Sequence, residues 1–160
     1  MQMRPVLLNS CARAASAAEA RFRIDVPIAP SRATRVVALD EESEAAVRRV
    51  AEQDWHHARF YSVGGEGLEL TRVDGATVPL VDELDGVDAT VLVASSDHGA
   101  EAAATIGAAC TVRGIMTAGL VLTTGASVAA ALTALRPHAR VLLVPAEEED
   151  LAELLRAIRA

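Results

Sequence analysis

The stretch VLVASSDHGAEAAATIGAAC, residues 91–110, decides the predicted fold. It opens with apolar β-branched residues, passes through a short polar turn and continues into an Ala-rich helical pattern. In a parallel sheet, such a turn follows the carboxyl end of a buried strand, where open α/β proteins bind ligands. The turn at 95–99 is therefore the first place to look for a site.

Strand and helix patterns alternate on both sides of this stretch. The helical pattern of residues 151–158, for example, places Leu151, Leu154, Leu155 and Ile158 on one face. The β-rich runs lie at 35–39, 58–63, 89–95, 115–122 and 140–146. This order predicts a three-layer, Rossmann-like α/β domain with a mostly parallel sheet of five or six strands. Residues 64–86 fit a strand, a turn at Asp74–Gly75 and a short helix.

The helix predicted at 100–112 differs from the others because it has almost no polar face. We therefore expect it to be central and buried on all sides, with Gly107 and the alanines allowing close approach of neighbouring backbones.

Residues 1–34 are predicted to form an arm or extended segment outside the Rossmann-like domain of residues 35–160. The stretch RFRIDVPIAP at 21–30 alternates apolar and polar residues, which favours an edge strand or an extended arm. The start of the chain superficially resembles an export signal, but its apolar core, PVLL, is too short. A flexible arm, or a short helix docked on a partner, fits better.

Composition excludes several classes of function. The net charge of −7 disfavours nucleic acid and anionic membrane surfaces, and no apolar run is long enough to span a bilayer. The chain has no lysine, which excludes a P-loop lysine, a Schiff base and a lysine general base. Two cysteines, Cys11 and Cys110, fit a reducing, cytoplasmic compartment, with Cys110 as a core thiol. No metal-ligand spacing and no catalytic residue is identified.

The turn after residue 94 provides the first set of candidate ligand-binding residues. Its backbone N–H groups could hold an anion at a helix N-terminus. Alternatively, a Ser or Asp side chain caps the helix and the glycine eases the turn. Asp97 and Glu101 place negative charge where a phosphate would bind, which favours capping. The candidates are Ser95, Ser96, Asp97, His98 and Gly99.

Two other turns could contribute to the same crevice. The turn at 40–43, DEES, lacks the glycines of a dinucleotide site, so we interpret it as an acidic helix start capped by Asp40 or Ser43. A Mg²⁺ site there has no further support. The turn at 123–127 offers the hydroxyls of Thr123 and Thr124, or simply a helix capped by Ser127.

A candidate interaction patch is formed by Trp55, His56 and His57, which include the only tryptophan of the chain. Aromatic residues are enriched at binding hot spots. Adjacent histidines point apart and do not bind one metal ion together, so the patch is predicted to contact a protein partner.

The stretch from Asp85 to Thr123 resembles the GTPase core of the tubulin/FtsZ family, in which a strand, a Gly-rich loop, an Ala-rich helix and a GI-x-T strand follow one another. Gly114, Ile115 and Thr117 and the Ala-rich helix match that pattern, as does RVLLVPA at 140–146. The resemblance implies a nucleotide-binding fold over residues 35–160. However, SSDHGAE replaces the Gly-rich loop, DEES replaces the first glycine turn, and Ala146 replaces an asparagine.

These observations predict a non-catalytic α/β scaffold or assembly domain, a homo-oligomer or part of a larger protein complex. No cofactor is expected, and GTP or another nucleotide is disfavoured. The alternative is a small-molecule binder or enzyme of Rossmann-like or phosphosugar-isomerase-like (SIS) type. It would bind a nucleotide or a sugar phosphate through the hydroxyls of the crevice at Ser95–Gly99.

Overall fold

A seven-stranded sheet forms the centre of the computed structural model, which describes residues 30–64 and 66–160. Its spatial order is β4-β3-β2-β1-β5-β6-β7. The strands are β1 (Thr34–Ala38), β2 (Ala58–Val63), β3 (Glu69–Arg72), β4 (Thr77–Pro79), β5 (Ala89–Ala94), β6 (Met116–Leu122) and β7 (Ala139–Ala146). The five strands β2-β1-β5-β6-β7 are parallel, in the flavodoxin-like order, and β3 and β4 extend the sheet as antiparallel strands.

The predicted fold class is confirmed, with one strand more than expected. The additional strand is β4, which has only three residues and pairs with β3 across the turn at Asp74–Gly75. Such a short strand cannot show the alternation by which a sequence reveals a strand. The short helix predicted in the same segment is present directly after it, as α4 (Leu80–Glu83).

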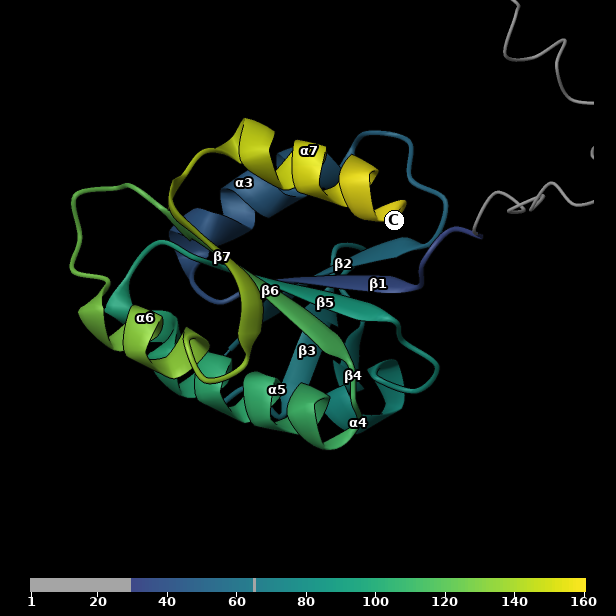
Figure 1. Cartoon of the computed structure of the whole chain (residues 1–160), viewed down its shortest axis with the longest axis horizontal. Coiled ribbons are helices and arrows are strands. Elements are labelled where there is room, and N and C mark those ends of the chain that lie inside the picture. The colour runs from purple at the N-terminus through teal and green to yellow at the C-terminus, as the bar shows by residue number, and fades with distance from the viewer. Residues whose placement is uncertain (1–29, 65) are drawn as a thin grey trace, which may run out of the picture.

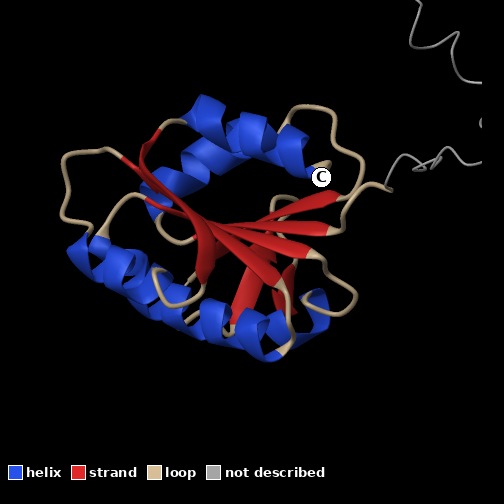
Figure 2. Cartoon of the chain, in the orientation of Figure 1, coloured by secondary structure: helices blue, strands red, loops and turns tan. Residues whose placement is uncertain are grey.

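Helices cover both faces of the sheet, as Figures 1 and 2 show. On one face lie α3 (Glu41–Ala51) and α7 (Glu148–Ile158). On the other lie α4, α5 (Ala100–Val112) and α6 (Ala129–Leu135), with a 3₁₀ turn, η2 (Asp97–Gly99), leading into α5. Each long helix thus follows the carboxyl end of a strand, so the strand-to-helix turns gather at one edge of the sheet.

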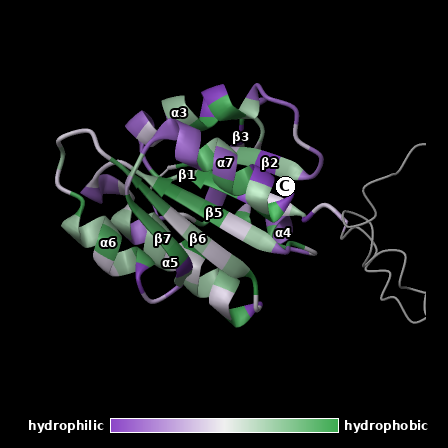
Figure 3. Cartoon of the chain, turned by 45° about the horizontal axis from the view of Figure 1, so that its top comes forward, coloured by the Kyte–Doolittle hydropathy of each residue, from purple (hydrophilic) through white to green (hydrophobic). Residues whose placement is uncertain are grey.

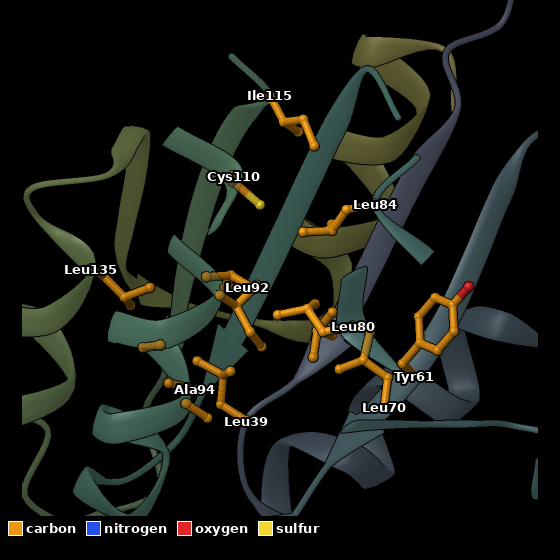
Figure 4. Packing of buried hydrophobic residues seen from close by; sticks show 14 of the residues in the cluster. Leu39, Tyr61, Leu70, Leu80, Leu84, Leu92, Ala94, Cys110, Ile115 and Leu135 are labelled. Atoms are coloured by element: carbon orange, nitrogen blue, oxygen red, sulfur yellow. The ribbon is translucent and has the colours of Figure 1, made fainter. Parts of the chain in front are cut away.

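The central strand β5 is buried over its whole length and separates two apolar cores. Leu92 and Ala94 face the core under α5 and α6, part of which Figure 4 shows. Val91 and Val93 face the core under α3 and α7. A strand covered on both faces needs apolar residues at every position, which explains the continuous apolar run in the sequence. Figure 3 shows the hydrophobic strands at the centre and hydrophilic residues on α3 and α7.

The prediction that α5 is buried on all sides is wrong. Its inner face packs against the sheet through Ala103, Ile106 and Cys110, but its outer face is exposed, and Val112 is 85% exposed. The exposed residues are Glu101, Ala104, Ala108, Thr111 and Val112, and the two alanines among them expose little apolar surface to water. At Gly107 the close neighbour is a side chain and not a backbone, since an added methyl would lie 2.5 Å from the ring of His138.

The predicted arm falls almost entirely on residues 1–29, which lie outside the described residues, as does Cys11. Residues 30–33 have no regular structure, and β1 begins at Thr34. Among the residues that the structure describes, none belongs to a helix long and apolar enough to cross a membrane.

Candidate functional site

The carboxyl ends of β1 and β5 lie side by side at the switch point of the sheet. From β1 the chain passes through α3 to β2 on one side, and from β5 it passes through α5 to β6 on the other. The two crossover helices cover opposite faces of the sheet, and the turns at 39–40 and 95–99 meet at this point before the helices begin. Ligands of open α/β sheets bind at this position.

The carboxylate of Asp40 lies at this switch point and joins the two turns. Its Oδ2 accepts hydrogen bonds from the backbone N–H of Ser95 at 2.7 Å and of Ser96 at 3.1 Å. Its Oδ1 accepts from the Ser95 hydroxyl and from the backbone N–H of Ser43 at 2.9 Å. Backbone N–H groups in a turn that leads into a helix can hold a phosphate, and here a carboxylate of the same chain accepts their hydrogen bonds.

The environment of Asp40 stabilises its charged form. Burial alone would raise the pKa of the carboxyl, but hydrogen bonds from the hydroxyl and backbone of Ser95 and from Ser43 outweigh it, so the pKa lies below its ordinary value. Asp40 also forms a capping box with Ser43 at the start of α3, as predicted from DEES. One carboxylate therefore caps a helix and joins two neighbouring turns.

The structure brings together three of the predicted site residues, Ser95, Ser96 and Thr124. The backbone carbonyl of Ser95 accepts a hydrogen bond from the Thr124 hydroxyl at 2.9 Å, while its N–H and hydroxyl both donate to Asp40. Ser95 is fully buried, and its hydrogen-bonding groups are all used within the chain. These hydroxyls join the turns after β1, β5 and β6 to one another.

Asp97 turns away from the switch point and caps a different helix from the one that follows it in sequence. Its carboxylate accepts hydrogen bonds from the Ser127 hydroxyl at 2.6 Å and from the backbone N–H of Ala131 at 3.0 Å, in the first turn of α6. These bonds hold the pKa of Asp97 below its ordinary value. The prediction that Ser127 itself caps α6 is therefore wrong, since Val128 is the N-cap residue and the acceptor comes from Asp97.

The other residues of this turn have separate roles. The Ser96 hydroxyl accepts from the backbone N–H of His98, at 3.4 Å, and so caps η2 rather than α5. The His98 side chain is exposed. Gly99 lies against Leu39 of the β1 turn, where an added methyl would be 2.5 Å from the Leu39 Cβ. Packing between the two turns therefore requires a glycine at position 99.

Beside the switch point, a hollow of about 760 Å³ lies at the carboxyl ends of β6 and β7. Thr123 and Thr124 line one side of it, so Thr123 faces this hollow and not the switch point. The charged residues that line it are Glu42, Glu147, Glu148, Asp150 and Arg49. The one cation among them, Arg49, is paired with Glu148 at 2.7 Å. The lining opposes a phosphate, because the acidic groups outnumber the basic one.

The residues of the predicted interaction patch lie at the opposite end of the domain, after α3. His56 and His57 are exposed, and Trp55 is half-buried. The indole Nε1 of Trp55 donates to the backbone carbonyl of Val50 at 2.8 Å, and its ring contacts Phe60, with ring centroids 6.3 Å apart. No group of three or more His, Cys, Asp or Glu side chains able to hold a metal ion occurs among residues 30–64 and 66–160.

The sequence prediction recognised Asp40 only as a helix cap and missed its place at the centre of the switch point. The available signal was its position, one residue beyond a buried strand and directly before an acidic helix start. Nothing in the pattern indicated that β1 and β5 are neighbours in the sheet, and only that pairing brings Asp40 to Ser95.

No protein-family model matches the chain, and no curated protein matches it either. A solved structure that matches is the crystal structure of a response regulator receiver protein from Pseudoalteromonas atlantica. It has 14% sequence identity and a TM-score of 0.42, over 78% of this chain and 94% of that chain. The resemblance to the tubulin/FtsZ family is therefore wrong. The Ala-rich helix and the GI-x-T strand that suggested it are patterns common to doubly wound sheets. The similarity to the receiver protein extends to the fold alone.

Proposed function

We propose that this chain is a non-catalytic α/β domain that works in protein assembly and associates with a second copy of itself through the β7 edge. The observation that carries the proposal is the Asp40 carboxylate on the N–H groups of Ser95 and Ser96. A nucleotide or sugar phosphate at the switch point would have to displace a half-buried, hydrogen-bonded negative charge of the chain itself. At the position where doubly wound folds bind ligands, this chain instead forms hydrogen bonds between its own turns.

The β7 edge supplies a surface for association. With eight residues, β7 is the longest strand described, and it has a neighbour, β6, on one side only. Two large apolar residues on it are open to solvent, Val141 at 42% and Val144 at 45%. A long edge strand with unpaired backbone groups and apolar side chains is suited to pairing with another strand. Arg140 and Pro145 are the two residues of β7 that oppose such pairing, and they lie outside the apolar stretch from Val141 to Val144.

The oligomeric state in solution tests this proposal. We expect light scattering to give a dimer for the wild-type chain and a monomer for the Val141→Lys/Val144→Lys variant, because lysine on an edge strand disfavours strand pairing. Val81→Lys is the matched control, since Val81 is 57% exposed and lies on α4, which directly follows β4 at the opposite edge of the sheet from β7. A wild-type chain that is monomeric at tens of micromolar would exclude the β7 dimer.

The second candidate, small-molecule binding, is favoured by the hollow beside Thr123 and Thr124. A thermal-shift panel of GTP, GDP, NAD and sugar phosphates separates the two functions, because a ligand that binds the folded state raises the unfolding midpoint. We expect no shift for the wild-type chain. In an Asp40→Ala variant, acetate or phosphate should raise the midpoint, because the N–H groups of Ser95 and Ser96 become free to bind an anion. Stabilisation of the wild-type chain by a member of the panel would favour the binding function instead.

A further inference from the structure

A hollow of about 550 Å³ lies where the described chain begins, between the ends of α3 and α7 and the start of β1. It is separate from the switch point and from β7. Its lining includes Pro30, Ser31, Trp55, His56, Arg156 and Arg159. We propose that residues 21–29 of the same chain dock in this hollow and cover Trp55.

The Trp55 indole is the large apolar surface of a hollow whose other lining residues are mostly polar or charged. The only polar atom of the Trp55 indole is already used, in the hydrogen bond to the carbonyl of Val50. The Arg156 guanidinium lies 5.8 Å from the ring centroid and donates to Gln53, at 2.6 Å. The ring is half-buried and therefore presents an incompletely covered apolar surface to the hollow. Apolar side chains gain most by covering such a surface.

The chain is held at the rim of this hollow. The backbone N–H of Arg32 donates to the carbonyl of Arg159 at 2.8 Å, and the hydroxyl of Ser31 is hydrogen-bonded to His57. Pro30 and Ser31 themselves line the hollow. The residues that directly precede Pro30 therefore start within reach of Trp55. Tethering of this kind gives a segment an effective local concentration on the order of millimolar, well above that of a separate molecule.

The sequence of the segment fits the apolar surface of the Trp55 indole. Residues 21–29 read RFRIDVPIA, in which Phe22, Ile24, Val26 and Ile28 occupy alternate positions. An extended segment with this alternation has one apolar side and one polar side. A second hollow, of about 650 Å³, continues beyond Phe60 and is lined by Ala51, Ala58 and Val73 among others. Trp55 lines the first hollow and Phe60 the second, and the centroids of their two rings lie 6.3 Å apart.

Trp55 is the only tryptophan of the full chain, so its fluorescence reports directly on this hollow. Quenching by acrylamide should be weak in the wild-type chain. It should lose that protection, with emission shifted to the red, in Ile24→Ser/Ile28→Ser. The matched control is Arg23→Ser/Asp25→Ser, which alters the intervening polar positions and should leave quenching unchanged.

Any one of three results would overturn the proposal. The first is equal quenching in the wild-type chain and in Ile24→Ser/Ile28→Ser. The second is equal loss of protection in the control variant. The third is protection that disappears on dilution of the wild-type chain, because the occupant would then come from a second copy. The β7 dimer can be absent while the protection is present, so the two proposals fail independently.

Discussion

Gly99 and Leu39 lie in contact across the switch point, backbone against backbone. A methyl group at Gly99 would lie 2.5 Å from the Leu39 Cβ and 2.8 Å from its carbonyl oxygen. The turn after β5 is thereby pressed against the turn after β1, and the N–H groups of Ser95 and Ser96 meet the Asp40 carboxylate. This contact and the hydrogen bonds together close the position at which doubly wound folds bind ligands.

Replacement of Gly99 by alanine should destabilise the protein by about 1–3 kcal/mol, because the added methyl overpacks a contact with backbone atoms. Its φ of −85° is allowed for alanine, so the cost is steric and not conformational. Urea unfolding measures the change. The control is Gly64→Ala, where an added methyl meets nothing within 4 Å and where no left-handed φ is required. Equal stabilities of the two variants would show that the turns can separate without cost.

Asp40→Asn should lower the free energy of unfolding at neutral pH by about 1.5–3 kcal/mol, the range for hydrogen bonds to a charged group. The pKa of Asp40 is lowered in the folded state, so the unfolded state takes up the proton at the higher pH. The stabilisation is therefore complete above about pH 4, the ordinary value for an aspartate, and is lost as the pH falls through the folded-state pKa.

Urea unfolding of both proteins from pH 7 to pH 2 checks this dependence. The difference between wild type and Asp40→Asn should stay constant down to about pH 4 and narrow below it. Glu83 and Asp97 also have lowered pKa values, but both variants contain them, so their contributions cancel in the difference. A difference that persists unchanged at pH 2 would mean that Asp40 acts through its shape and not through its charge.

The sequence predicted the central elements of the fold well and their mutual arrangement poorly. The apolar run that became β5 and the helix over 100–112 were located correctly because their signals are local. The role of Asp40 depends on the pairing of β1 with β5, two strands separated by β2, β3 and β4 along the chain. Asp97 likewise caps α6, whose first turn lies 34 residues farther on. Periodicity and capping rules describe neighbours in sequence, and these two carboxylates act between neighbours in space.

Glu83 joins the β3–β4 hairpin and α4 to the parallel part of the sheet, and its removal should be costly. Its buried carboxylate accepts hydrogen bonds from the Tyr61 hydroxyl and from the Arg72 guanidinium, the latter at 2.7 Å. Burial opposes its charge, but these two bonds outweigh that effect and hold the pKa of Glu83 below its ordinary value. Glu83→Gln should destabilise the fold by about 1–3 kcal/mol, because the amide has no charge and keeps only one acceptor oxygen for the two donors.

Tyr61→Phe should cost about 1 kcal/mol, the net value of a single hydrogen bond. A double-mutant cycle with Glu83→Gln measures the coupling, which we expect to be 0.5 kcal/mol or more, on the order typical of residues in one network. The contribution of Arg72 should be smaller, because its side chain is 36% exposed and solvent screens the pair. Additive effects of Tyr61→Phe and Glu83→Gln would show that the two side chains act separately.

Cys110 should be unreactive in the folded protein. Its thiol is fully buried on the inner face of α5, where it lies 3.5 Å from the Thr90 hydroxyl, and burial raises its pKa. Both effects reduce the thiolate that reacts with disulfide reagents. A Cys11→Ser variant isolates the signal, and its single thiol should react with Ellman's reagent only in denaturant, at a rate that follows unfolding. Rapid reaction under native conditions would show that α5 opens from the sheet. The rate of reaction of Cys110 therefore measures how firmly α5 is held against the sheet.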